Sequence, residues 1–190
     1  RAYRKRDKIL KFEGGFHGTH DYSAMSVSTR SPKAFPSPTL DSAGIPHVLT
    51  DMLLVATFND LGTAEALIAA HHDELAAVIL EPYQRVIVPA PGFLQGLRDV
   101  TRRYGVPLIF DEIVTGFRLA YGGAQEHYGV VPDLATYGKV LAGGFPLAAV
   151  AGPAEIMRHF DPALEGTPDH VWQAGTLNGN PIAASAGLAT

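Results

Sequence analysis

The chain has 190 residues and a net charge of −4, with 46% hydrophobic and 18% charged residues, a balance typical of a globular protein with a sizeable core. It has no basic stripe that would bind nucleic acid, and its lack of cysteine excludes disulfides, thiolate metal sites and cysteine nucleophiles. No apolar run approaches the length of a membrane span, so we expect a cytoplasmic protein without membrane contact.

A strand is expected at Lys8–Phe12, close to where the chain begins. Short continuous apolar runs, which are typical of strands buried on both faces, follow at Ala76–Leu80, Pro107–Phe110, Leu134–Tyr137 and Leu147–Ala151. Helical patterns lie between and after these runs. The alternation predicts βαβ units and an α/β fold with a mostly parallel sheet and flanking helices.

Four segments have the spacing or the end signals of helices. The segment from about Asp60 to Leu75 has apolar residues at helical spacing, with Asn59 or Asp60 as its N-cap. A second helix is predicted to open at Pro91 and to end with Gly105 as its C-cap. Shorter helices are expected near residues 153–159 and over 181–190.

Two further segments bear on domain organisation. Residues 23–47 are rich in Ser, Pro and Thr, including Ser31-Pro32, and predict a long loop over one face of the domain. The sequence has no initiator Met, and the helical pattern of residues 181–190 is unfinished. We therefore expect residues 1–190 to be a partial domain of a longer chain.

Three polar residues follow predicted strand ends: Glu81, Asp111 and Lys139. In open parallel sheets, ligands bind beyond the carboxyl ends of the strands, so chemistry is expected there. Most lysines are exposed, but Lys139 has apolar or glycine neighbours on both sides. Desolvation lowers the pKa of a lysine and makes its amine a nucleophile toward carbonyl groups.

Asp111 ends an apolar strand, and two roles are open for it. It is either a helix cap or a carboxylate held at the sheet edge, where it could pair with the ring nitrogen of a pyridine cofactor. Other motif classes are missing: Gly138-Lys139 lacks the Walker A pattern, and no dinucleotide-binding Gly-x-Gly-x-x-Gly opens a helix. His71-His72 lacks the spacing of a metal site, so no metal is expected.

An ordered set of motifs resembles the class III (subgroup II) aminotransferases, and within them the glutamate-1-semialdehyde 2,1-aminomutase branch. The matching segments span nearly the whole chain and are Lys11–Gly18, Phe58–Leu61, Ala77–Pro82, Pro91–Leu94, Leu108–Arg118, Gly122–Gln125, Tyr137–Lys139 and Gln173–Pro181. The resemblance implies fold type I of the pyridoxal 5'-phosphate (PLP) transferases. Residues 1–190 would form part of the PLP-binding large domain, with the N-terminal segment and the C-terminal small domain absent.

The resemblance also implies roles for single residues. Lys139 would form the Schiff base with PLP and then move protons, and Asp111 would bind the pyridine nitrogen. Ile113 and Phe16 would pack on opposite faces of the ring, and His17 would help to hold the loop of Phe16. Glu81 would lie near the cofactor hydroxyl and the substrate.

Partners follow from the same resemblance. Thr176 would reach the phosphate of the neighbouring subunit in a homodimer whose active sites lie at the interface. The substrates would be a small amino compound and a small carbonyl compound. Gln125 belongs to the motif without an assigned role, and Arg118 would bind a substrate carboxylate or form a structural ion pair.

Each of these assignments has a structural alternative: Phe16 as core, His17 as a structural histidine and Glu81 as a cap of the following turn. The segment Tyr83–Pro89 is shorter than in the aminomutases, and the glycine run before Phe145 has one glycine fewer. These departures favour a transaminase, with the aminomutase as the alternative. A third alternative is a fragment or scaffold of the same fold without activity.

Overall fold

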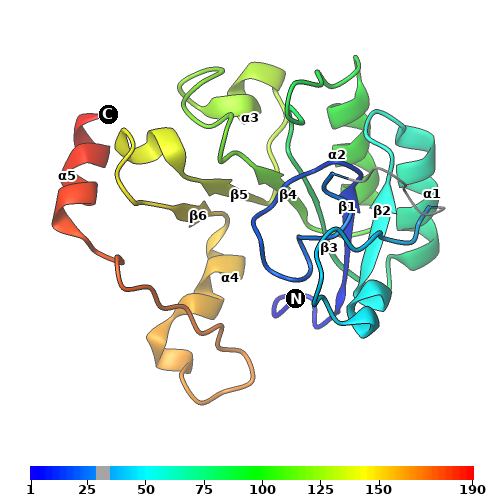
Figure 1. Ribbon diagram of the computed structural model, residues 1–190, viewed down its shortest axis with the longest axis horizontal. Helices are drawn as coiled ribbons and strands as arrows, with labels where there is room; N and C mark the ends of the chain where they lie inside the picture. Colours follow the sequence, from blue (N-terminus) through cyan, green and yellow to red (C-terminus); the bar gives the residue numbers. More distant parts are fainter. Residues whose placement is uncertain (29–34) are drawn as a thin grey trace.

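A six-stranded sheet with the strand order β2-β1-β3-β4-β5-β6 forms the centre of the computed structural model, which describes residues 1–28 and 35–190 (Figure 1). All neighbouring strands pair in parallel except β5 and β6, which pair antiparallel. The predicted α/β fold with a mostly parallel sheet is confirmed. The strands are β1 (Lys8–Phe12), β2 (Leu53–Ala56), β3 (Leu75–Leu80), β4 (Leu108–Asp111), β5 (Leu134–Tyr137) and β6 (Ala149–Ala151).

Five α-helices accompany the sheet within the described residues. They are α1 (Leu61–His71), α2 (Phe93–Arg103), α3 (Gly123–Tyr128), α4 (Ala154–Met157) and α5 (Pro181–Ala189). Short 3₁₀ helices cover His47–Met52, Lys139–Ala142, Arg158–Phe160 and Pro162–Leu164. No helix in the part of the chain that the structure describes is long and apolar enough to cross a membrane.

Most predicted elements are present, with changes at their ends. Asp60 is the N-cap of α1 and accepts a hydrogen bond from the backbone N–H of Thr63 at 3.0 Å. The helix ends at His71, however, so the prediction of helix up to Leu75 is wrong, because Leu75 already pairs in β3. Pro91 does not open α2, because Gly92 with a φ of 80° is the N-cap.

Leu147 and Ala148 lie outside β6, and two elements were missed altogether. The missed elements, β2 with four residues and α3 with six, are too short for their periodicity to be seen in the sequence. β2 is an edge strand of the sheet, and α3 begins at Gly123, directly after Gly122.

Successive residues of the central strands face opposite sides of the sheet. The residues that face α1 and α2 form the main core, and they include Leu10, Phe12, Val78, Leu80, Leu108 and Phe110. The alternate residues Ile9, Lys11, Ile79 and Ile109 face the other side, which we call the loop face. At the carboxyl ends of β3 and β4, the same alternation places Glu81 and Asp111 toward the loop face.

The predicted long loop lies on this loop face. Met25 and Ile45 pack there against Leu53 and Val55 of β2 in a second, smaller core. The described part of residues 23–46 is irregular, apart from a single bridge between Met25 and Leu40, and His47 begins a 3₁₀ helix. The Ser31-Pro32 part of the prediction lies outside the described residues.

Lys11 is a charged residue next to the last position of β1, and only 1% of its surface is exposed. Its ammonium donates hydrogen bonds to the carbonyl oxygens of Gly15 at 2.9 Å, Ser23 at 3.3 Å and Met25 at 2.6 Å. Burial lowers the pKa of Lys11 to about 8, and the negative charges of Glu13, Asp41 and Glu81 partly oppose this decrease. The charge therefore lies in the protein interior at neutral pH, with carbonyl groups as its hydrogen-bond partners.

Arg98 of α2 ties this helix to two strands. Its guanidinium donates two hydrogen bonds to the carboxylate of Asp133, at 2.6 and 2.9 Å, and Arg98 itself is buried. Asp133 also accepts a bond from the backbone N–H of Leu108 at 2.8 Å. The pair thus fixes the starts of β4 and β5 relative to α2.

Replacing Arg98 by Met should lower the free energy of unfolding by about 1–3 kcal/mol, because Asp133 keeps its charge and loses its bidentate partner. Urea unfolding of the complete protein measures this loss. Arg102→Met, an exposed position on the same helix, is the matched control and should change the free energy by less than about 0.5 kcal/mol. Equal effects of the two variants would contradict the role of the pair.

The pKa of Lys11 gives a pH dependence with a defined sign. An unfolded chain keeps this lysine protonated up to about 10.5, whereas the folded chain releases the proton near pH 8. Between these values the unfolded state binds more protons, so the free energy of unfolding rises with pH. Urea unfolding at pH 7.5 and about pH 10 should show this rise in the wild type relative to Lys11→Met. A constant difference between the two proteins would contradict the lowered pKa.

Candidate functional site

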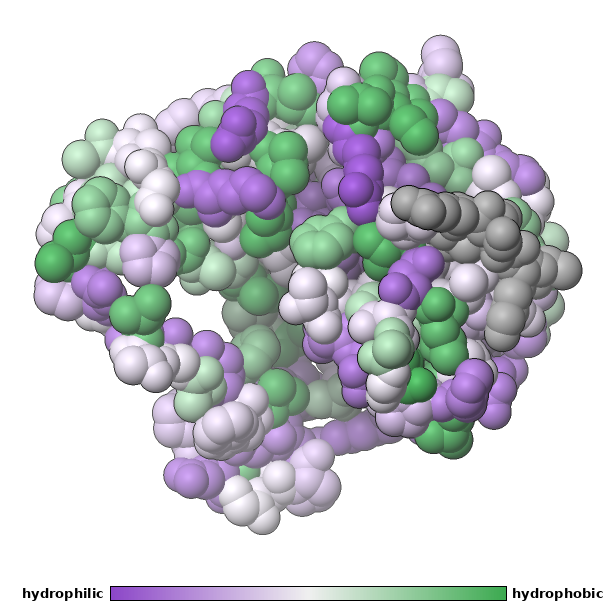
Figure 2. Space-filling model, in the orientation of Figure 1, coloured by the Kyte–Doolittle hydropathy of each residue, from purple (hydrophilic) through white to green (hydrophobic). Residues whose placement is uncertain are grey.

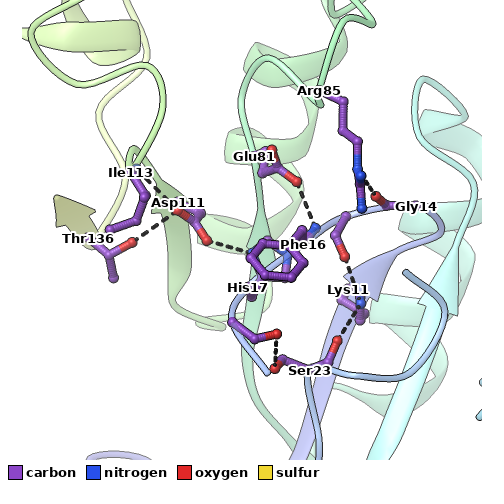
Figure 3. Close-up of polar contacts among 12 residues, drawn as sticks. Lys11, Gly14, Phe16, His17, Ser23, Glu81, Arg85, Asp111, Ile113 and Thr136 are labelled. Carbon is purple, nitrogen blue, oxygen red and sulfur yellow. Dashed lines mark hydrogen bonds and ion pairs between the residues drawn. The ribbon is translucent and has the colours of Figure 1, made fainter. Parts of the chain in front are cut away.

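Asp111 lies at the carboxyl end of β4 and is the centre of a hydrogen-bonded cluster (Figure 3). Its Oδ1 accepts hydrogen bonds from the backbone N–H of Ile113 at 3.1 Å and from the hydroxyl of Thr136 at 3.4 Å. Its Oδ2 lies 2.8 Å from Nδ1 of His17. The carboxylate is buried, so these partners hold it in one orientation.

His17 comes from the loop after β1, 94 residues before Asp111 in the sequence. Both side chains are almost fully buried, with 6% and 9% of their surfaces exposed. An ionised carboxylate only accepts hydrogen bonds, so Nδ1 of His17 donates to it. The other ring nitrogen, Nε2, is buried and has no hydrogen-bond partner within the described structure.

Glu81 holds the neighbouring residue of the same loop. Its Oε1 accepts a hydrogen bond from the backbone N–H of Phe16 at 2.7 Å, and the carboxylate is buried at the end of β3. The contact described for Glu81 is thus with the loop after β1 and not with the turn that follows Glu81 itself. The ring of Phe16 is 45% exposed, which makes Phe16 a poor core residue. The Arg85 guanidinium lies over this ring, 6.0 Å from its centre.

Lys139 follows β5 and begins a short 3₁₀ helix. A Cβ atom on the preceding Gly138 would lie 3.0 Å from the side chain of Ile113, so the backbone at this point packs closely against Ile113. Ile113 therefore connects Asp111 to the start of the Lys139 segment. Lys139 has a φ of 46°, a left-handed conformation that costs energy in a residue other than glycine and that is frequent at functional sites.

The sequence context of Lys139 predicts a desolvated side chain, and this prediction is wrong for the described structure. Lys139 is exposed, as are most residues from 143 to 152 that follow it. The apolar neighbours in the sequence suggested burial, but the described residues leave one side of the lysine uncovered.

Glu112 is a buried neighbour of Asp111 that the sequence does not single out. It is fully buried and accepts hydrogen bonds from the Thr115 hydroxyl at 2.8 Å and from the backbone N–H groups of Ala124 and Gln125 at 2.7 and 3.1 Å. Gly123, with a φ of 73°, leaves room for this carboxylate, because an added Cβ would lie 2.5 Å from it. Glu112 therefore anchors the start of α3 directly beside Asp111.

Gln125 acquires a structural contact through the same helix. Its side-chain N–H donates a 2.7 Å hydrogen bond to the hydroxyl of Tyr137, the residue two positions before Lys139. Burial raises the pKa of the Tyr137 phenol, the Glu112 carboxylate adds to the rise, and the bond from Gln125 opposes it. Arg118 is exposed, and the structural ion pair considered for it is not present among the described residues.

Two predicted site residues, Lys139 and Thr176, have no described side-chain contact with the Asp111 cluster. Thr176 lies in an exposed turn between residues 176 and 179, before α5. A groove of about 690 Å³ extends from Ile113 and Thr136 to Trp172 and Gln173. The space-filling view shows the gap between this C-terminal segment and the body of the molecule (Figure 2). Within the described residues, no three His, Asp or Glu side chains lie where they could hold a metal.

Solved structures with the same fold include several transaminases. An ω-transaminase from Sphaerobacter thermophilus superposes with a TM-score of 0.90 at 44% identity, covering 99% of this chain and 44% of that protein. A glutamate-1-semialdehyde aminomutase from Pseudomonas aeruginosa superposes with a TM-score of 0.75 at 32% identity, covering 98% of this chain and 42% of that protein.

Curated relatives and a family model agree with this likeness. Glutamate-1-semialdehyde 2,1-aminomutases from Pelotomaculum thermopropionicum and Methanococcus vannielii are 49% and 46% identical over all of this chain. The chain spans 43% of the length of each. The model of the family "Aminotransferase class-III" matches residues 1–190. The chain therefore belongs to the class III aminotransferase family.

Proposed function

We propose that the complete protein is a PLP-dependent enzyme that transfers an amino group between an amino compound and a carbonyl compound. The observation that carries the proposal is the buried pair of His17 and Asp111 at the carboxyl edge of a parallel sheet, close to the Lys139 segment. Family membership supports the same reaction class. The activity is assigned to the complete protein, because this chain spans less than half of its relatives.

The residues of this chain fit the cofactor. A carboxylate offers about four acceptor positions, and the three partners of Asp111 leave one for the N–H of a pyridinium ring. Phe16 presents an exposed aromatic ring and directly precedes His17, which is bonded to the same carboxylate. The Nε2 atom of His17 has no hydrogen-bond partner among the described residues, so the cluster can still bind one more polar group.

When bound, PLP withdraws electrons from the substrate carbon that carries the amino group, which makes the proton on that carbon acidic. Asp111 supports this by holding the ring nitrogen in its protonated form. The position of Asp111 is set by hydrogen bonds from the Ile113 backbone and from Thr136. A hydrogen bond from His17 compensates the negative charge of Asp111. The carboxylate is thereby oriented before any ligand arrives, which is the arrangement that electrostatic catalysis requires.

Phe16 and Ile113 are assigned to the two faces of the cofactor ring. The ring of Phe16 projects from a loop whose backbone is bound by Glu81, and Ile113 is held by its packing on Gly138. Glu81 is assigned to the side of the cofactor hydroxyl and the substrate. Lys139 is assigned to hold the cofactor and to carry protons on its Nζ, in keeping with its strained backbone.

Aminomutase activity is the second candidate, in which the amino group returns to another carbon of the same molecule. The relatives at 46–49% identity are glutamate-1-semialdehyde 2,1-aminomutases, which favours it. The 44% identical ω-transaminase of Sphaerobacter thermophilus and the changed segment Tyr83–Pro89 favour transfer between two molecules. Both reactions use the same cofactor and the same residues of this chain.

We also propose a homodimer in which Thr176 reaches the phosphate site of the neighbouring subunit. The exposed apolar residues of the C-terminal part support it, since Trp172 is 78% exposed and Leu188 is 91% exposed. Tryptophan in particular is enriched at protein–protein interfaces. An additional N-terminal segment, a C-terminal small domain and a cytoplasmic location stay predictions.

Replacing Lys139 by Ala should abolish the visible absorption that PLP acquires on binding to the complete protein, because the cofactor loses its covalent attachment. Activity should fall by a factor of about 10³ or more. Lys8→Ala, at the opposite end of the sheet, is the matched control and should leave the spectrum unchanged. An unchanged spectrum in Lys139→Ala would contradict the assignment.

Replacing Asp111 by Asn should leave some cofactor bound and lower kcat by about 100-fold or more, because a neutral amide does not stabilise the pyridinium. Asp99→Asn, on the exposed face of α2, is the matched control. Steady-state kinetics with a PLP titration separates loss of binding from loss of turnover. Wild-type turnover in Asp111→Asn would contradict the role of the carboxylate.

A further inference from the structure

We propose that Lys11 is a positioning residue, whose ammonium joins the two limbs of the loop after β1 and so fixes Phe16 and His17 against the cofactor. The inference rests on the proposed function for the identity of the ligand. It concerns a residue outside the assigned site, in the strand rather than at its end. Lys11 does not touch the reacting groups and acts only through the loop.

The number of donors matches the number of acceptors. An ammonium has three N–H donors, and Lys11 directs them to three carbonyl oxygens. Gly15 lies on the outgoing limb of the loop, directly before Phe16, whereas Ser23 and Met25 lie on the returning limb. Figure 3 shows Lys11 between the segment that carries Gly14 and Phe16 and the segment that carries Ser23.

The partners of Lys11 distinguish it from an ordinary buried ion pair. Among the described residues, no carboxylate lies within salt-bridge distance of its Nζ. Glu13, Asp41 and Glu81 attract the charge from farther away, and Arg85 repels it. An ammonium that is buried among carbonyl groups is costly, and an apolar side chain would fill the same space in β1. The specific contribution of the lysine is therefore the set of bonds to the loop.

Side chains from the segment after β3 also hold the same loop. Gln84 donates to the carbonyl of Glu13 at 2.7 Å, and Arg85 donates to that of Gly14 at 3.0 Å. A backbone bond from Gly14 to Ser26 closes the base of the loop at 2.9 Å. These contacts secure residues 13 and 14. The N–H of Gly15 donates to the carbonyl of Phe12 at 3.0 Å, and the carbonyl of Gly15 is held by Lys11.

Loss of the ammonium would leave these three carbonyl groups without donors in a site that water hardly reaches. Buried carbonyl groups without partners are unfavourable, so the loop would turn them toward solvent. Phe16 and His17 directly follow Gly15, and their bonds to Glu81 and Asp111 would then hold them without the support of Lys11. The variant should therefore bind the cofactor in a less defined orientation while the sheet itself stays folded.

The test compares Lys11→Met with Lys8→Met, the same substitution three positions earlier in β1, in the complete protein. Hydrogen exchange of the cofactor-free protein reports on the loop without any ligand. Visible circular dichroism with added PLP reports on the orientation of the bound cofactor. A general loss of stability would not alter this orientation while the rest of the fold stays unchanged.

We expect Lys11→Met to exchange amide protons in residues 13–28 about tenfold faster than the wild type, with unchanged exchange in α2. The affinity for PLP should fall about tenfold, with a weakened visible dichroic band. Lys8→Met should match the wild type in both measurements.

Two results would overturn the proposal. One is wild-type exchange and dichroism in Lys11→Met, and the other is faster exchange throughout the sheet and α2, which would make Lys11 a general stabilising residue. A wild-type protein that shows no visible band with PLP would instead refute the proposed function. The exchange measurement would then still decide whether Lys11 orders the loop.

Discussion

The hydrogen bond between His17 and Asp111 is the contact on which the candidate site depends. It joins the loop after β1 to the end of β4, two parts of the chain that are 94 residues apart. The bond exists because β1 and β4 both pair with β3, so their carboxyl ends reach the same edge of the sheet. A shift in either pairing would turn Asp111 or Lys11 to the opposite face.

Buried charges at this edge are compensated mainly by backbone groups. Glu112 accepts from two backbone N–H groups, Glu81 accepts from that of Phe16, and Lys11 donates to three carbonyl groups. Each such contact fixes a segment of irregular chain to a regular element. The loops that carry Phe16 and Ile113 are thus positioned by charged side chains, although they have little apolar core of their own.

The sequence predicted the parts of the fold that have strong local signals. Continuous apolar runs marked β3, β4 and β5, and the residues directly after these runs are the ones that gather at the sheet edge. The short elements β2 and α3 lack such signals, and Leu75 was assigned to a helix because its spacing continued the pattern of α1. The burial of Lys11 was not predictable, since a charged residue in a strand normally indicates a solvent face. Contacts such as that of Glu112 with Ala124 depend on a glycine turn whose shape the sequence alone does not define.

A crystal structure of the complete protein with PLP tests the central claim most directly. We predict that the pyridine nitrogen lies within hydrogen-bond distance of the Asp111 carboxylate. Phe16 and Ile113 should lie on opposite faces of the ring, with His17 still bonded to Asp111. A cofactor bound elsewhere, or one whose ring nitrogen faces a group other than Asp111, would contradict the account.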